Sequence, residues 1–263
     1  MVKISPTFTF TFHRPLGRRH VFTGNPATVE HILRTRFSNY QKGSTAKLIL
    51  SDFLGTGIFN ADGNTWKFQR QVASHEFNTK SLRKFVEHVV DVELSDHLVP
   101  VLASAAQQGQ TLDFQDILQH FAFDNICKIA FGYDAEYLTS STERSKFAVA
   151  YEEATEISSK WFREPLPLVW KIKRLLNIGS EKRLRIAVKE VHEFAKKIVR
   201  EKKKELKKKP SLESVRMLSR FLSSGHYDED FVTDIVISFI LAGKDTTSAA
   251  LTWLFWLLWK NPR

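Results

Sequence analysis

The feature that most constrains this chain is one long, predominantly apolar stretch, residues 228–260. As a single helix it would span about 48 Å at 1.5 Å of rise per residue, about three times the length of an average helix. Apolar residues occupy nearly every face of that helix on both sides of its centre. This distribution predicts a helix that is buried all round, with the rest of the chain packed about it.

The centre of this stretch interrupts the apolar pattern with the segment AGKDTT, residues 242–247. Charges and hydroxyls are costly inside a buried helix. A membrane span needs about twenty uninterrupted apolar residues, and Lys244 with Asp245 divides the run into two shorter pieces. Two interpretations follow, a core helix with satisfied polar groups and a helix that contributes to a site.

The order of residues within AGKDTT favours a site. Ala242 and Gly243 remove side-chain bulk, so that a flat ligand would approach the backbone. Thr246 lies one turn later, where its hydroxyl would donate to the Ala242 carbonyl and loosen the helix locally. The segment therefore predicts a hydroxyl beside a gap, with the carboxylate of Asp245 next to it.

The N-terminal part predicts a small β-hairpin followed by helices. Residues 7–12 alternate strictly between threonine and phenylalanine, as in a half-buried strand, and residues 20–23 would return beside them. Asn25 is expected to cap a helix that has Pro26 at its first position and runs to about Arg36.

Residues 43–64 are predicted to be rich in loops, because they contain several glycines and an Asp-Gly turn. Four apolar residues lie close together in this segment and would be exposed in a plain loop. We expect them either to fold back onto a core or to line a pocket: Phe53, Leu54, Ile58 and Phe59.

A helix over residues 65–77, capped by Asn64 or Thr65, places Trp66 and Arg70 on one face, four residues apart. An indole N–H and a guanidinium are both donors without an acceptor. Side by side they suit a carboxylate ligand. A cation–π pair on the helix surface is the alternative.

Further helices are expected over residues 78–106, with a bend at Pro100, from a cap at Asp113 to Gly132, and over residues 141–161. A basic helical segment then extends to Pro210. Cys127 falls within an apolar stripe of the second of these helices. As the one cysteine of the chain, it excludes a disulfide framework and suits a reducing compartment.

The net charge of +10 raises the question of a nucleic-acid or anionic-membrane partner. Much of the excess lies in one run, residues 196–209, which predicts a solvated helix end. No stacking aromatic residue or recognition motif accompanies the run, so nucleic-acid binding is not expected. An anionic membrane surface or a protein partner stays open.

AGKDTT resembles the [AG]-G-x-[DE]-T-T segment in the distal helix of haem-thiolate monooxygenases, the cytochrome P-450 superfamily. The hairpin, the Trp66/Arg70 helix and FDNICKIAFGYD occur in the family's order. The stretches GIFNADGNTWKFQRQVASHEFN and DIVISFILAGKDTTSAALTWLFWLL resemble the plant fatty-acid ω-hydroxylase branch, which includes hydroxylases of jasmonoyl–amino-acid conjugates.

This resemblance covers essentially the whole chain and implies about half of the family's enzyme. The implied fold is mainly α with a small N-terminal β-hairpin, the N-terminal half of the cytochrome P-450 fold up to its long distal helix. Residues 1–263 would form one partial domain. The family's membrane anchor, its E-x-x-R helix and its axial cysteine are expected outside this sequence.

By resemblance, Trp66 and Arg70 would hold the haem propionates, while Ala242 and Gly243 would let the distal helix pass over the porphyrin. Thr246 would position the proton donor for cleavage of the O–O bond, and Asp245 would connect it to solvent. An apolar substrate entrance, suited to an acyl chain, would be lined by Phe53, Leu54, Ile58 and Phe59.

Two apparent matches to family motifs are rejected. Cys127 lies in mid-helix without the Gly-rich loop that presents the axial thiolate, so it is interpreted as a buried core thiol, and no metal ligand is assigned. Glu213 to Arg216 spells E-x-x-R but precedes the long helix, whereas the family's motif follows it. We interpret it as coincidence.

The resemblance implies a haem-dependent monooxygenase that ω-hydroxylates long-chain fatty acids. Its electrons would come from NADPH through a membrane-bound reductase, at the cytoplasmic face of the endoplasmic reticulum membrane. Hydroxylation of jasmonoyl–amino-acid conjugates is the alternative substrate prediction. The alternative of a different class is a truncated, non-catalytic helical protein that does not bind haem.

Overall fold

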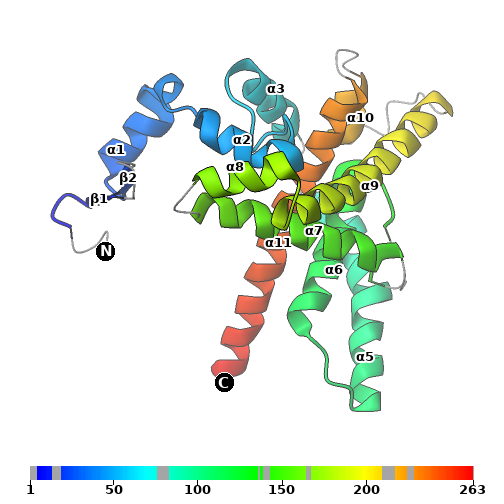
Figure 1. The fold of residues 1–263 in the computed structure, drawn as a ribbon. Coiled ribbons are helices and arrows are strands. Elements are labelled where there is room, and N and C mark those ends of the chain that lie inside the picture. Colours follow the sequence, from blue (N-terminus) through cyan, green and yellow to red (C-terminus); the bar gives the residue numbers. More distant parts are fainter. Residues whose placement is uncertain are drawn as a thin grey trace.

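The computed structural model describes residues 5–13, 19–75, 83–135, 137–138, 143–163, 167–208, 217–223 and 228–262. Helices dominate, and a two-stranded antiparallel sheet lies at the N-terminal edge of the molecule (Figure 1). The predicted fold class, mainly α with a small N-terminal hairpin, is confirmed. The main elements are β1 (Thr9–His13), β2 (Arg19–Thr23), α1 (Pro26–Glu30), α2 (Gly43–Leu54), α3 (Gly63–Ser74), α5 (Val99–Gln108), α6 (Phe114–Ile126), α7 (Glu143–Arg163), α8 (Pro167–Leu176), α9 (Ser180–Lys208), α10 (Met217–Ser223) and α11 (Glu229–Lys260).

Shorter helical segments of π or 3-10 geometry extend or precede several of these helices. They are His31–Thr35, Phe37–Asn39, Val86–Val90, Glu93–Leu98 and Cys127–Phe131.

The hairpin begins two residues later than the alternation predicted. Thr9 pairs with Thr23 and His13 with Arg19, and the Phe10 and Phe22 rings stack with centroids 5.0 Å apart. Residues 14–18, which join the two strands, lie outside the described residues. Asn25 caps α1 as expected, since its side-chain oxygen accepts from the amides of the second and third residues that follow it.

The prediction of a loop over residues 43–64 is wrong in its first half, because Gly43–Leu54 is the helix α2. Gly43 and Gly55 both have positive φ, of 80° and 48°, and they mark the two ends of this helix. Ile49 and Phe53, four residues apart, are buried on its inner face. Burial of these two apolar side chains on one helix face therefore stabilises a helix here, although the segment also contains serines and glycines that favour loops.

Helix α3 exists as predicted but starts earlier, with Asp62 at the N-cap position. The Asp62 carboxylate makes no capping bond and instead lies 2.9 Å from the ammonium of Lys47. Residues 76–82, where the end of this helix and the start of the next were predicted, lie outside the described residues. Pro100 sits in the first turn of α5, which directly follows a π-helical segment.

The predicted cap at Asp113 and the predicted helix end at Gly132 are confirmed. Asp113 accepts from the amide of Asp116 at the start of α6, and Gly132 ends the following π turn in the left-handed conformation. Asp228 caps α11, with its carboxylate 2.8 Å from the amide nitrogen of Phe231. The single long helix predicted from the apolar stretch is therefore present.

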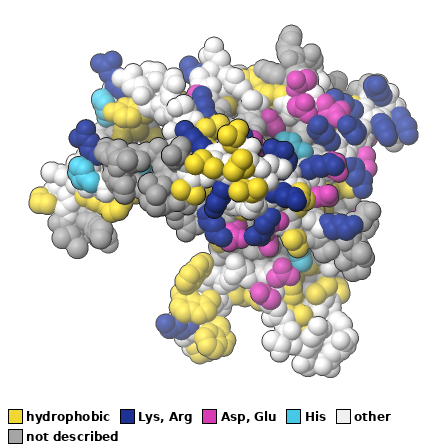
Figure 2. Space-filling model, in the orientation of Figure 1, with side chains coloured by type: hydrophobic (Ala, Val, Ile, Leu, Met, Phe, Trp, Pro, Cys, Tyr) yellow, Lys and Arg dark blue, Asp and Glu magenta, His cyan; other side chains and the backbone are white. Residues whose placement is uncertain are grey.

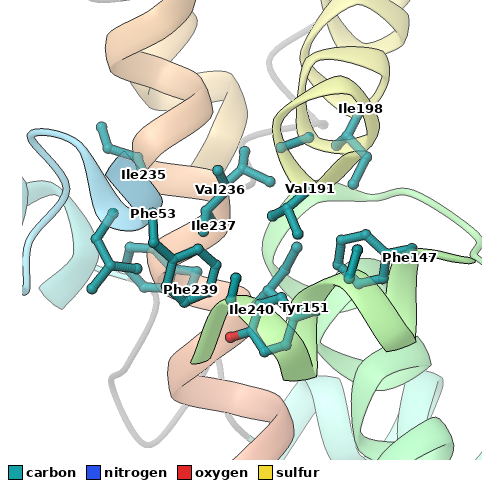
Figure 3. Close-up of a cluster of buried hydrophobic side chains, with 14 of the residues drawn as sticks. Phe53, Phe147, Tyr151, Val191, Ile198, Ile235, Val236, Ile237, Phe239 and Ile240 are labelled. Carbon is teal, nitrogen blue, oxygen red and sulfur yellow. The ribbon is translucent and has the colours of Figure 1, made fainter. Parts of the chain in front are cut away.

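The first half of α11 is the centre of the core. Ile235, Val236, Ile237 and Ile240 are fully buried among side chains from α2, α7 and α9 (Figure 3). Tyr151 of α7 meets the ring of Phe53 of α2 edge-on at 5.4 Å. Most of the chain is thus arranged around this half of the helix, as the sequence predicted.

The second half of α11 contradicts the prediction of burial all round. It projects away from α7 and α9 toward the lower edge of the molecule (Figure 1), where it forms an apolar column (Figure 2). Trp253 is 62% exposed and Trp259 is 77% exposed. Leu251 and Phe255 of this half still contact described residues, since Leu251 packs against the apolar cluster that contains Ile117 and the Phe255 ring meets that of Phe114 of α6 edge-on at 5.0 Å. Burial fails beyond Thr252, where every residue from 253 to 260 is exposed.

By length and composition α11 is the one helix among the described residues that would cross a membrane. Its most apolar window is 44% buried inside the protein. Protein, and not lipid, therefore surrounds a large part of this helix, which supports the core-helix interpretation.

Candidate functional site

A cavity of about 510 Å³ lies where the α2–α3 loop (residues 55–62) and the adjoining helix α3 meet the middle of α11, which is distant in sequence. Its lining brings together five of the predicted site residues, namely Ile58, Phe59, Trp66, Arg70 and Ala242. The other lining residues are Lys42, Ala73, Ser74, Ser238 and Phe239. The cavity is therefore apolar on the loop and α11 sides and cationic beside α3.

Trp66 and Arg70 project from adjacent turns of α3 to the same cavity. The Trp66 ring is fixed by Phe37, with centroids 5.1 Å apart. No cation–π contact joins Trp66 to Arg70, and the guanidinium has no hydrogen-bond or ion-pair partner among the described residues. Both donors are thus available to an anionic ligand.

Lys42 adds a second cation that the sequence analysis missed. It lines the cavity, its ammonium donates to the carbonyl of Ala61, and it lies 3.7 Å from the Asp62 carboxylate. No local motif marks Lys42, because its place at the cavity depends on how residues 43–62 fold, and these were predicted to be a loop.

Ala242 and Gly243 face different neighbours. Ala242 lines the cavity. A Cβ atom on Gly243 would lie 2.5 Å from Cγ1 of Ile126, on α6. The missing side chain of Gly243 therefore allows α6 to approach α11 closely. On the side of α11 that faces the cavity, it is the small side chain of Ala242 that leaves room.

The predicted hydrogen bond within α11 is present, since the Thr246 hydroxyl donates to the Ala242 carbonyl at 2.6 Å. Asp245 and Thr246 do not line the cavity but lie on the next turn, where Thr246 is exposed. Ala242 and Thr246 are four positions apart, so their side chains lie only about 40° apart around the helix axis.

Lys244 is a buried cation beside Asp245. Its ammonium lies 3.3 Å from an Asp245 carboxylate oxygen, 3.2 Å from Oε1 of Gln119, and 5.4 Å from the centroid of the Tyr151 ring. Burial, assisted by the nearby Asp245 carboxylate, raises the pKa of Tyr151 well above its usual range. Asp245 thus lies between a buried cation and solvent, and its side chain is 38% exposed.

Phe53 and Leu54 do not lie at the cavity. Both are 2% exposed and belong to the hydrophobic core. The reason is the helix that was not predicted, because α2 turns these two side chains toward α7 and α11. Ile58 and Phe59 follow the turn at Gly55 and line the cavity, so the predicted apolar set is divided between core and cavity.

Cys127 is fully buried within the core cluster, as predicted. Burial, together with the carboxylates of Asp124 and Asp134, raises the pKa of its thiol well above the usual range. The thiol is therefore held neutral, whereas a metal ligand must be a thiolate. Among the described residues no group of three or more His, Cys, Asp or Glu side chains would hold a metal ion.

We expect the 263-residue chain, expressed as given, to show no thiolate-type absorption band after reduction under carbon monoxide. Cys127 is its single cysteine, and the surrounding core leaves no space for a porphyrin beside the sulfur. A reduced-CO difference spectrum tests this. A strong band that disappears in Cys127→Ala would identify Cys127 as the axial ligand and contradict the assignment.

The residues around the cavity fit the haem that the resemblance implies. Haem carries two propionate carboxylates and a broad apolar face. Trp66, Arg70 and Lys42 supply three donors to the cavity, two of them cationic, and Phe239 and Ala242 supply an apolar surface from α11. The unpaired guanidinium of Arg70 is the feature of this donor set that most needs an anionic partner.

The family model described as cytochrome P450, here written P-450, matches residues 3–263. Cytochrome P-450 94A1 of Vicia sativa is 72% identical over 263 residues, which are 100% of this chain and 51% of that protein. Cytochrome P-450 94A2 of Vicia sativa is 63% identical, over 97% of this chain and 50% of that protein. Cytochrome P-450 94B1 of Arabidopsis thaliana is 48% identical, over 99% of this chain and 51% of that protein.

This chain spans about half the length of these curated relatives. Among solved structures, the crystal structure of a cytochrome P-450 (CYP102L1) matches with a TM-score of 0.73 and 18% identity, covering 96% of this chain and 56% of that one. At that identity the likeness concerns the fold alone.

Proposed function

Because this chain belongs to the cytochrome P-450 family, we propose that the protein containing it is a haem-dependent monooxygenase that ω-hydroxylates long-chain fatty acids. The observation that carries this proposal is the cavity, with an apolar loop and α11 wall opposite the donors of α3. A volume of about 510 Å³ is within the usual range for small-molecule sites.

Bound haem supplies the oxidising chemistry, in which one atom of O2 enters a C–H bond and the other leaves as water after uptake of two electrons and two protons. Trp66, Arg70 and Lys42 would bind the propionates and fix the group against α11. Ile58 and Phe59 would exclude water from the acyl chain. The Thr246 hydroxyl and the Asp245 carboxylate would hold and relay the protons.

In this proposal the electrons come from NADPH through a reductase partner at the cytoplasmic face of the endoplasmic reticulum membrane. Basic residues in the second half of α9 form ion pairs with carboxylates at the start of α11. Lys196 lies 2.8 Å from the carboxylate of Asp230, and Arg200 2.8 Å from that of Glu229. Part of the positive charge therefore holds α9 to the start of α11, and nucleic acid is not proposed as a partner.

A jasmonoyl–amino-acid conjugate is the second candidate substrate, because the sequence resembles a branch of the family that includes hydroxylases of such conjugates. A full-length protein containing this sequence, reconstituted with an NADPH-dependent reductase, is the test. We expect oxidation of dodecanoic acid near its methyl end. Turnover of jasmonoyl conjugates alone would favour the second candidate, and failure to bind haem would favour a non-catalytic protein.

Arg70→Ala is expected to weaken haem retention in the full-length protein. The substitution leaves a partly buried propionate without its charged donor, at a cost of about 1–3 kcal/mol. Arg70→Lys should recover only part of this loss, since an ammonium lacks the planar fork of a guanidinium. Haem occupancy after gel filtration and the midpoint of thermal unfolding measure the effect. Full occupancy with unchanged stability in Arg70→Ala would place Arg70 outside the haem site.

A further inference from the structure

The α2–α3 loop is tied to α11 by one carboxylate. Oδ2 of Asp234 accepts from the backbone N–H of Thr56 at 2.7 Å and from its hydroxyl at 3.1 Å. These residues are 178 positions apart in the chain. The contact therefore connects two walls of the cavity, since the loop contributes Ile58 and Phe59 and α11 contributes Phe239 and Ala242.

The loop backbone also lies directly against α11. A Cβ atom on Gly55 would be 2.0 Å from Oδ2 of Asp234, and one on Gly57 would be 2.0 Å from the Ser238 hydroxyl. Distances this short leave no room for any side chain at either glycine. Asp234 and Ser238, one turn apart, therefore form a continuous surface on which the loop rests.

Thr56 is held from its other side by α3. The amide of Gln69, which is fully buried, donates to the Thr56 carbonyl at 2.9 Å. The amide of Asn60 donates to the Gly55 carbonyl at 2.7 Å. All three segments that line the cavity are thus joined at Thr56, directly before the residues whose side chains form the apolar wall.

The carboxylate of Asp234 is costly in this place. Its residue is 8% exposed, it forms no ion pair among the described residues, and burial raises its pKa even though the bonds from Thr56 act in the opposite direction. A buried acid without a cation contributes little net stability. Its benefit lies in the fixed geometry that two converging hydrogen bonds impose on the loop.

We propose that Asp234 is a positioning residue that sets the distance between the α2–α3 loop and α11, and with it the fit of an aliphatic chain in the cavity. The proposal rests on the proposed function for the assignment of the cavity to a chain-like substrate. Asp234 itself touches no substrate. It acts through Thr56 on Ile58 and Phe59, which form the wall.

The test compares imidazole with 1-dodecylimidazole as optical probes of the haem in the full-length protein. The ratio of their dissociation constants measures what the alkyl chain gains from the cavity. We expect Asp234→Ala to lower this ratio about tenfold, the equivalent of one lost hydrogen-bonded contact to a charged group. Thr56→Val, which keeps the N–H, should lower it about threefold. Affinity for imidazole itself should not change.

Two variants retain the bonds. Asp234→Asn keeps an oxygen that accepts from both Thr56 donors, and Thr56→Ser keeps the hydroxyl, so both should bind 1-dodecylimidazole like the unmodified protein. Thr233→Val is the matched control on the neighbouring position, because it removes a buried hydroxyl that bonds only within α11, to the Glu229 carbonyl. It should leave the ratio unchanged.

Hydrogen exchange at the Thr56 amide supplies a measurement independent of haem ligands, and it should be faster in Asp234→Ala than in Asp234→Asn. An unchanged ratio in Asp234→Ala, or an equal loss in Thr233→Val, would overturn the proposal. If Asp234→Ala does not fold, Thr56→Val and Thr56→Ser replace it as the test. A ratio that is lowered in Thr56→Val and kept in Thr56→Ser supports the proposal, and an equal ratio in the two variants would overturn it. Absence of fatty-acid turnover with the expected ratios would reject the proposed substrate and leave the role of Asp234 in place.

Discussion

Thr246→Ala in the full-length protein is expected to keep consuming NADPH while forming at least about tenfold less hydroxylated product per NADPH. This factor is smaller than the rate gain of about 100-fold or more that a positioned proton-transfer group typically supplies. The missing electrons should appear as hydrogen peroxide. The reason is that the substitution removes a hydroxyl next to the cavity without touching the donors that would hold the haem. Product, peroxide and NADPH measured in one reaction give the ratio directly.

The geometry of α11 places Thr246 on the same side of the helix as the cavity. Ala242 lines the cavity, and Thr246 lies one turn further along and donates to its carbonyl. Thr247 is about 100° further round the helix. Thr247→Ala is therefore the control and should not change the ratio of product to NADPH.

Asp245→Asn should behave differently from Thr246→Ala. The Asp245 carboxylate lies between the buried ammonium of Lys244 and solvent, where it would relay protons from water. Its loss should slow NADPH consumption and product formation together. A normal product ratio in Thr246→Ala would reject the role given to Thr246, and a lowered ratio in Thr247→Ala would show that the other face of the helix meets the haem.

Patterns local in the sequence predicted the elements well. The apolar run over residues 228–260 predicted the long helix, and Asn25 and Asp113 cap helices because each supplies an oxygen to an amide two or three residues away. Such bonds depend on neighbours in the chain, so spacing alone is sufficient to predict them.

The errors arise where a residue's meaning depends on a distant segment. Glycines at both ends of α2 were interpreted as signs of a loop, and this placed Phe53 and Leu54 at the substrate entrance when they lie in the core. Gly243 was assigned to the cavity side of α11, but its missing side chain is required by Ile126 of α6. A glycine in the sequence indicates that a neighbour comes close to the backbone, but it does not identify that neighbour as a ligand or as another helix.

The same limit explains why Lys42, which lines the cavity, and Asp234, which positions one of its walls, were missed. Lys42 and Asp234 belong to no motif, and their roles come from contacts with residues about 20 and 178 positions away. Trp66 and Arg70, in contrast, are four residues apart on one helix, so their common face followed from helical geometry. Candidate ligands within one element were predictable, and the residues that position the elements were not.

Gly55→Ala is expected to lower the free energy of unfolding by about 3–5 kcal/mol, from a left-handed backbone that favours glycine and from the loss of hydrogen bonds to a buried carboxylate. Gly55 has φ of 48°, and its added Cβ would displace the Asp234 carboxylate, whose three terminal atoms lie within 2.4 Å of that position. Chemical denaturation of the variant and the unmodified protein measures the difference.

Gly63→Ala measures the cost of an added methyl group at a positive φ without a close neighbour. Gly63 also has positive φ, of 59°, but a Cβ atom there would meet nothing within 4 Å. Gly63→Ala should therefore lower the free energy of unfolding only through backbone strain, by about 1 kcal/mol. Gly109→Ala should have the same effect, because Gly109 has φ of 61° and equally open space around it. The excess cost of Gly55→Ala over these two then combines two effects: the contact between the α2–α3 loop and Asp234, and the different backbone of Gly55, whose ψ is −122° against 25° for Gly109. Equal costs at all three glycines would show that the loop yields to an added methyl group, and that Asp234 does not hold it rigidly against α11.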